Sequence, residues 1–150
     1  MQKYKMNFNI QFQNLINLKL PTDKFVVVSS GALSVRGIRE SEDLDVIVTQ
    51  DLWNEMIKKY KVGINDWGIE NLQLENDIEI LNPAQSIFGN SEIVPMEEIF
   101  EKADMFDNIK FINLEHLRKI KLKLGREKDL LDVKLIDKHL NQANGSNTSI

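Results

Sequence analysis

The stretch that decides the fold is residues 25–48, which read FVVVSSGALSVRGIRESEDLDVIV. It begins with the apolar run Phe25–Val28 and ends in a second run, Leu44–Thr49. Runs of this length that are rich in β-branched residues predict strands buried on both faces. Between them, Ala32–Arg36 predicts a short helix that ends at Gly37. The stretch is therefore a strand–helix–strand unit, which indicates a mixed α and β structure.

The rest of the chain alternates extended and helical patterns in the same way. Further strands are predicted at residues 69–74, 77–81 and 109–112, and further helices at residues 8–18, 52–60, 96–103, 113–124 and 127–140. Asp51 is expected to cap the helix that follows it. We expect an α/β (α+β) domain over residues 1–140, with a mixed β-sheet flanked by helices and two C-terminal helices. The polar residues 141–150 should form a disordered tail.

Composition excludes several classes of protein. The 150 residues contain no cysteine, which excludes disulfides, thiolate zinc sites and cysteine nucleophiles. The longest uninterrupted apolar run, Phe25–Val28, is far shorter than the roughly 20 residues that a membrane-spanning helix needs. The first residues alternate polar and apolar side chains and so lack a signal-peptide core. We therefore expect a cytoplasmic protein that does not enter a membrane.

The net charge of −4 hides an asymmetry along the chain. Residues 66–107 contain eleven acidic residues and one basic residue, a local charge of −10. Residues 108–128 contain seven basic and two acidic residues, a local charge of +5. The split has two interpretations: a solvated acidic face beside a basic helix, or a cation-binding acidic cluster that faces an anion-binding helix.

Two carboxylates share one face of the second predicted strand. Asp43 and Asp45 alternate with Leu44, so their α-carbons should lie roughly 6.5–7 Å apart on the same side. Carboxylates at this spacing repel each other unless water or a cation lies between them. Mg²⁺ prefers such oxygen ligands together with substrate phosphates. The alternative is that Asp43 simply begins the strand at an exposed end.

A third carboxylate lies on a later strand. Glu79 stands between two isoleucines in the run 77–81, and a charged residue inside a buried strand is costly unless it is paired or metal-bound. Asp77 shares its face, so either acid could serve, and Glu79 is preferred because apolar residues flank it. Glu79 could instead face water on an edge strand or pair with a lysine.

A turn of small residues precedes the first two acids. Backbone N–H groups at a helix start, with the hydroxyl of Ser30 and the close approach that Gly31 allows, suit a phosphate. An ordinary serine N-cap is the alternative. Arg39 and Ser41 follow the turn, where an arginine can contact phosphate oxygens or hold the acidic end of the strand. Arg36 ranks below Arg39 because it is expected to face solvent.

The basic run lies on the predicted helix 113–124 and just after it. Lys121 borders the apolar stripe of this helix, where a lysine either extends to solvent or reaches into a site. Asp129 and Asp132 fall in the first turns of the last helix, which accounts for them as caps or as partners of Arg126. The two histidines of the chain are interpreted as surface or packing residues.

Residues 29–48 resemble the core of the nucleotidyltransferase superfamily that includes DNA polymerase beta and the minimal nucleotidyltransferases. The family pattern is a strand, a Gly-Ser-type turn, a short helix and a hydrophobic-flanked Asp-x-Asp, with a third acid on a later strand. It corresponds here to Ser30-Gly31, Asp43, Asp45 and Glu79. Residues 121–132, KLKLGREKDLLD, are similar to the Lys…Arg-x-Lys-Asp-x-x-Asp signature of the AbiEii-like branch, known from abortive-infection and toxin–antitoxin systems.

The resemblance implies an enzyme that transfers a nucleoside monophosphate from a nucleoside triphosphate to an acceptor hydroxyl. Mg²⁺ or Mn²⁺ would be held by Asp43, Asp45 and Glu79, and Glu79 would also help to deprotonate the acceptor. The nucleotide-binding residues would be Ser30, Gly31, Arg39, Ser41, Lys121 and Arg126. The acceptor is left open between a small molecule, a tRNA end and a protein, and a partner protein or a homodimer is possible.

Three rival interpretations belong to other classes. The first is a catalytically inactive member of the same fold that acts as a binding or toxin–antitoxin partner. The second is a metal-dependent glycosyltransferase, which also uses Asp-x-Asp but normally places it after a full nucleotide-binding half-domain, whereas only 42 residues precede Asp43. The third is a nucleic-acid-binding module, which the overall acidity disfavours.

Overall fold

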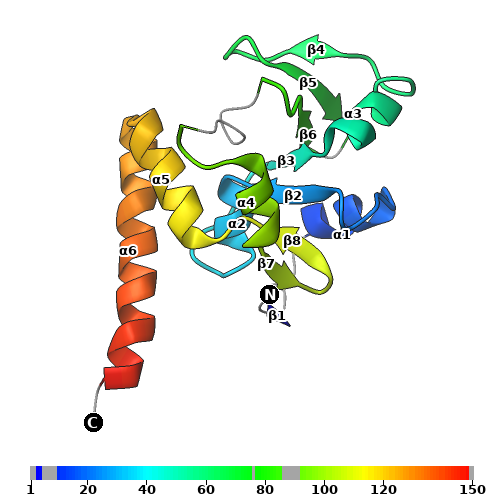
Figure 1. Cartoon of the computed structure of the whole chain (residues 1–150). Helices are drawn as coiled ribbons and strands as arrows, with labels where there is room; N and C mark the ends of the chain where they lie inside the picture. The colour runs from blue at the N-terminus through cyan, green and yellow to red at the C-terminus, as the bar shows by residue number, and fades with distance from the viewer. Residues whose placement is uncertain (1–2, 5–9, 76, 86–91, 149–150) are drawn as a thin grey trace.

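A computed structural model describes residues 3–4, 10–75, 77–85 and 92–148 of the chain. It contains one mixed sheet of eight strands in the order β1-β7-β8-β2-β3-β6-β5-β4. The strands are β1 (Lys3–Tyr4), β2 (Phe25–Val28), β3 (Leu44–Val48), β4 (Gly63–Ile64), β5 (Glu70–Leu74), β6 (Ile78–Leu81), β7 (Asp104–Phe106) and β8 (Ile109–Phe111). The helices are α1 (Ile10–Asn17), α2 (Ser30–Ser34), α3 (Gln50–Met56), α4 (Met96–Glu101), α5 (Leu114–Leu124) and α6 (Glu127–Thr148). The predicted fold class is confirmed: a mixed sheet is flanked by helices, and two helices end the chain (Figure 1).

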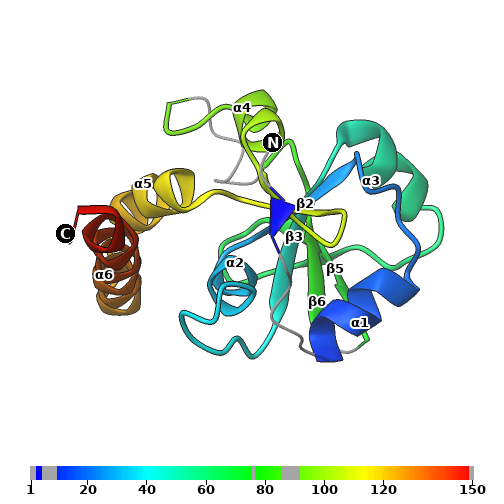
Figure 2. The same cartoon turned by 90° about the horizontal axis from the view of Figure 1, so that it is seen from below.

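Each face of the sheet is covered by a different set of helices. α1 and α3 cover one face, whereas α4 and the α5–α6 hairpin lie on the other side (Figure 2). The central strands alternate between the two cores, since Val46 and Val48 pack in the first and Ile47 packs in the second. The predicted alternation along β3 is thus confirmed, and it turns Asp45 toward the side of α4 and α5.

Most predicted elements form within a few residues of the expected positions, and the differences occur at their ends. The sequence pattern missed the short strands β1, β4 and β7, although it predicted β8, which is as short as β7. The cap assigned to Asp51 is wrong. Thr49 is the N-cap of α3, and its hydroxyl accepts the backbone N–H of Leu52. No described helix is long and apolar enough to cross a membrane.

The α5–α6 hairpin is defined by local signals that the sequence carries. The side chain of Asn113 accepts the N–H of His116 at 2.7 Å and so caps α5. Gly125 ends it in the left-handed conformation, with φ 66°. The tail predicted as disordered from residue 141 is instead helical through Thr148. Extending an established helix adds one hydrogen bond for each residue ordered, so α6 continues into a polar segment that would not nucleate a helix by itself.

Candidate functional site

Two carboxylates from different strands are brought side by side. β3 and β6 pair in parallel, and Asp45 is directly in register with Glu79. Side chains in register on neighbouring strands project from the same face, so both acids point to the side of α4 and α5. Asp77, the alternative third acid, is exposed beyond the start of β6. Of the two candidates, the structure brings Glu79 to Asp45.

The two acids lie in a cavity of about 350 Å³. Its walls come from the sheet, from the segment that joins β4 to β5, and from the inner face of α5 with the turn that follows it. The lining residues are Ser29, Asp45, Asn65, Trp67, Ile69, Glu79, Leu81, Gln85, Leu117, Ile120, Lys121, Leu124 and Arg126. The volume is in the range of small-molecule sites, and the lining combines an apolar side with a few polar groups.

The negative charge of Asp45 and Glu79 is not matched by an ion pair with a positive side chain among the described residues. Burial, the charges of Asp43 and Glu79 and a hydrogen bond with Glu79 raise the pKa of Asp45 to about 7, although the hydroxyl of Ser29 acts in the opposite direction. The pKa of Asp43 is also raised, by burial first and then by the charges of Glu79 and other acids. No described lysine, arginine or histidine makes an ion pair with any of these three carboxylates. The cluster is therefore a place where a cation is electrostatically favoured.

Amide groups hold Glu79 in place. The side-chain N–H groups of Asn71 and Asn65 both donate to its Oε2, with the Asn65 bond at 3.5 Å. Such neutral donors orient a carboxylate without cancelling its charge. Glu79 is thereby fixed in the cavity while it keeps its capacity to bind a cation.

The opposite wall of the cavity is basic, but its cations are already paired. The Lys121 ammonium is buried and lies 2.8 Å from Asp132 and 3.6 Å from Asp129. Arg126 donates through Nε and Nη2 to the same Asp129. Burial acts to raise the pKa values of both aspartates, but the neighbouring cations lower them. Arg126 and Lys121 lower the pKa of Asp129, and Arg39 and Lys121 lower that of Asp132. Asp129 and Asp132 are thus more than caps: they anchor the basic wall.

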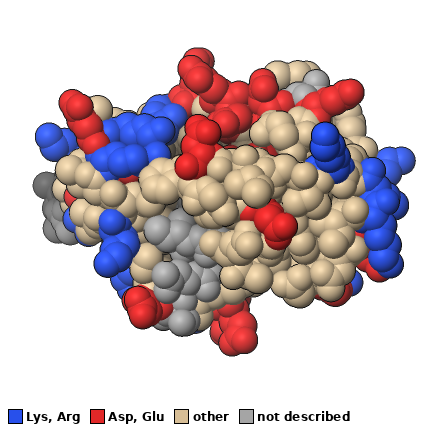
Figure 3. Space-filling view, turned by 90° about the horizontal axis from the view of Figure 1, so that it is seen from above, with Lys and Arg blue, Asp and Glu red and all other residues tan. Residues whose placement is uncertain are grey.

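Charges of the two signs are also separated on the surface. Seen from above, Lys and Arg side chains gather at the end of the molecule formed by α5 and α6, beside a group of Asp and Glu side chains (Figure 3). The acids of α4 are exposed, so this part of the acidic stretch is solvated surface. The interpretation as solvated surface is therefore correct for the acids of α4.

Four of the proposed nucleotide-binding residues do not line the cavity. Arg39 forms a two-pronged ion pair with Asp132 at 2.8 and 2.9 Å, and it ties the segment after α2 to α6. Ser41 bonds to the side chains of Ser34 and Gln11. The hydroxyl of Ser30 donates to the backbone oxygen of Asp43 at 3.4 Å.

Gly31, the fourth of these residues, has a packing role. A Cβ atom there would lie 2.7 Å from Cγ1 of Val27 and 2.8 Å from Cδ2 of Leu44, so only glycine lets α2 approach the sheet this closely. The turn residue that does line the cavity is Ser29, which the sequence analysis passed over. Its φ of 61°, rare for a serine, turns it toward Asp45, and no local sequence pattern reveals such a conformation.

Arg36 does not face solvent as expected. Its guanidinium is largely buried, pairs with Asp104 at 2.6 Å, donates to the backbone oxygens of Ala32 and Ile112, and lies over the ring of Phe106. It joins α2 to β7 and β8, a long-range contact that local sequence cannot show. Its role is structural, as is that of His116, a buried packing residue of α5.

The carboxylates that could hold a metal do not form a complete site by themselves. In the described part of the chain, no three His, Asp or Glu side chains are grouped closely enough to bind a metal ion. Asp43 is exposed at the start of β3, whereas Asp45 and Glu79 lie inside the cavity. Mg²⁺ is normally held by one or two carboxylates plus waters and substrate phosphates, so the donors present fit that pattern of partial coordination.

Comparisons with known proteins add no identification. No family model, no curated protein and no solved structure matches this chain.

Proposed function

We propose that this protein is a Mg²⁺-dependent nucleotidyltransferase, which transfers a nucleoside monophosphate from a nucleoside triphosphate to an acceptor hydroxyl. One observation carries the proposal: a half-buried acid pair, Asp45 and Glu79, which makes no ion pair with a described cation, shares a cavity with the basic residues Lys121 and Arg126. Acids on one wall suit a divalent cation, and cations on the other suit the phosphates that such a cation accompanies.

The raised pKa of Asp45 supports a bound cation beside this carboxylate. A buried carboxylate beside two other acids is costly when ionised, and a divalent cation removes that cost. Mn²⁺ has the same preference for oxygen ligands. The donors in the cavity are all oxygen, so either ion fits them.

Each residue has a role that follows from its place. Asp45 and Glu79 would hold the cation from inside the cavity, and the exposed Asp43 would add to its attraction only through its nearby charge. When bound, the metal supplies charge neutralisation at the attacking and leaving oxygens. Glu79 would accept the proton of the acceptor hydroxyl. Lys121 and Arg126 would stabilise charge on the phosphates, and Asp129 and Asp132 keep both cations in position.

A second candidate follows from the pairing of those cations. Lys121 and Arg126 already form ion pairs with two buried aspartates, so they are less available to stabilise charge on a phosphate during transfer. A protein that binds nucleotide without catalysis does not need them for that purpose. That candidate is the inactive partner protein of a toxin–antitoxin type. It predicts nucleotide binding without transfer to any acceptor, whether small molecule, tRNA or protein.

The test compares two acids of equal charge. Calorimetry with a non-hydrolysable triphosphate and Mg²⁺ should give binding to the wild type and to Asp51→Asn, an exposed acid on α3. Asp45→Asn should bind at least tenfold more weakly, since a ligand to the metal is lost. Equal affinity for both variants would refute the proposal. Transfer of an α-labelled phosphate to candidate acceptors then separates the enzyme from the inactive partner.

A further inference from the structure

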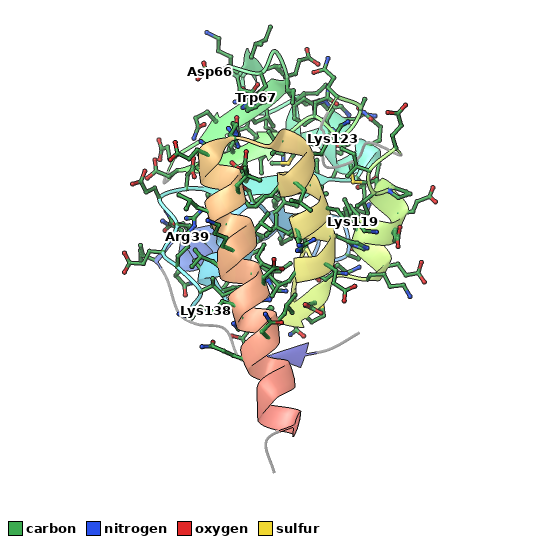
Figure 4. All side chains as sticks on the ribbon, turned by 90° about the vertical axis from the view of Figure 1, so that its left-hand side faces the viewer. Arg39, Asp66, Trp67, Lys119, Lys123 and Lys138 are labelled. Atoms are coloured by element: carbon green, nitrogen blue, oxygen red, sulfur yellow. The ribbon has the colours of Figure 1, made fainter. Side chains whose placement is uncertain are left out.

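An exposed tryptophan stands at the mouth of the cavity. Trp67 lies between β4 and β5, and 58% of its surface is exposed although it is the largest side chain of the lining. The guanidinium carbon of Arg126 is 4.8 Å from the centre of its ring. Figure 4 shows Trp67 above the end of the α5–α6 hairpin, the end that carries Arg126. The ring is thus held over the site by a cation–π contact.

The turn that carries Trp67 is held by hydrogen bonds. The Asn65 side-chain oxygen accepts the backbone N–H groups of Trp67 at 2.9 Å and Ile69 at 3.0 Å. The N–H of Gly68 donates to the backbone oxygen of Asn65, and Gly68 has a φ of +75° that favours glycine. The amide nitrogen of Asn65 also donates to Glu79. One side chain therefore sets the position of the ring relative to the acid pair.

The lining of the cavity combines charged and apolar side chains. Its acids and cations are Asp45, Glu79, Lys121 and Arg126, and its apolar lining residues are Trp67, Ile69, Leu81, Leu117, Ile120 and Leu124. A triphosphate and its metal use only the charged groups. The apolar lining residues suit a flat ring that gains free energy from leaving water and from stacking on an aromatic face.

We propose that the apolar side chains of the lining form the nucleobase subsite and that the base stacks on Trp67. This inference rests on the proposed function, since it assigns the remaining part of the same ligand. Stacking on an aromatic ring accepts every base, because each has a π face. The larger purines should bind more tightly than the pyrimidines. Arg126 is a positioning residue for the ring, held in turn by Asp129.

The experiment separates the base from the phosphates. The full chain is titrated with a non-hydrolysable purine triphosphate and with inorganic tripolyphosphate, both with Mg²⁺. Trp67→Ala should weaken nucleotide binding about tenfold or more and leave tripolyphosphate binding unchanged. Trp67→Phe, which keeps an aromatic face, should restore most of the affinity. Ile64→Ala is the matched control, because Ile64 is 73% exposed on β4 but does not line the cavity.

A second readout needs no variant. The other tryptophan, Trp53, is buried in the core on the far face of the sheet, so a change in fluorescence on binding reports Trp67. Nucleotide should quench the emission, and tripolyphosphate should not.

The outcomes distinguish the two proposals. If the wild type binds nucleotide and Trp67→Ala binds it equally well, the base subsite is refuted while the proposed function stands. If Trp67→Ala loses tripolyphosphate as well, the ring acts through the phosphate site and the base subsite is again refuted. If the wild type binds neither ligand, both proposals fail.

Discussion

Two pairs of acids, one buried on α6 and one half-buried on the sheet, have opposite electrostatics. Asp129 and Asp132 on α6 are paired with Lys121, Arg126 and Arg39, and their pKa values are lowered. Asp45 and Glu79 on the sheet have no ion pair with a described cation, and the pKa of Asp45 is raised to about 7. Burial acts in the same direction on Asp45, Asp129 and Asp132, so the neighbouring charges make the difference.

The difference separates acids that join segments of the fold from acids that make no ion pair among the described residues. The α6 acids satisfy cations that would otherwise be buried alone, and they connect three segments of the fold. Apart from the hydrogen bond between them, the sheet acids have neutral hydrogen-bond partners such as Asn65 and Asn71, and the ionised form of Asp45 costs stability. An acid that is kept at such a cost in a cavity is a candidate for a bound cation.

The largest loss of stability is expected from removing one of the two α6 aspartates that pair with cations. Asp132→Ala leaves Lys121 buried with only the longer contact to Asp129, and it releases Arg39. Removal of one partner of a buried ion pair typically costs about 3–5 kcal/mol, so the free energy of unfolding in urea should fall by about that amount. A loss below about 1 kcal/mol would show that the network is not structural.

Removing a charge from the sheet acids Asp45 and Glu79 should raise the stability of the protein instead of lowering it. The pKa of Asp45 is about 7 in the folded protein against an ordinary value of 3.8. As the pH rises from 4 to 7, the unfolded chain loses this proton first, so wild-type stability should fall and then level off above pH 7. Asp45→Asn cannot ionise and should be about 2 kcal/mol more stable than the wild type at pH 8. A variant that is less stable than the wild type at pH 8 would contradict the assignment.

A bound divalent cation should neutralise the negative charge of Asp45 and Glu79 and so stabilise the folded protein. At pH 8, Mg²⁺ at ten times its dissociation constant should stabilise the wild type by about 1.4 kcal/mol, measured as a higher melting temperature. Asp45→Asn should show a clearly smaller shift, and Ca²⁺ provides a comparison for selectivity. Identical shifts in both proteins would place the cation elsewhere.

The smallest effect is expected at the exposed pair of the same hairpin. Arg118 and Asp137 join α5 and α6 at 2.7 Å with about two fifths of each side chain exposed. An exposed ion pair contributes about 0–1 kcal/mol, so Asp137→Ala should change the stability by less than 1 kcal/mol. This variant is the control for Asp132→Ala, because both remove an aspartate from α6. A cost comparable to that of Asp132→Ala would remove the distinction between buried and exposed pairs.

The helices and the central strands were predictable because their signals are local. The β-branched runs mark β2 and β3, and Asn113 and Gly125 mark the two ends of α5. The site was only partly predictable. Lys121 could reach a cavity or extend to solvent, and its burial between Asp129 and Asp132 depends on how two helices pack. Ser29 was missed because its φ of 61°, which is rare for a serine, has no local sequence signal.

The sequence alone determined that Asp45 shares a face of β3 with Ile47, because strand alternation depends only on neighbouring residues. Asp43, predicted on the same face, lies before the strand and is exposed. The sequence also pointed to Glu79 as an acid within an apolar strand. Only the tertiary structure decided that β3 lies beside β6, in the register that places Asp45 next to Glu79. Strand order and register depend on the total packing of the sheet against its helices, which is a non-local free energy and leaves no pattern in either strand.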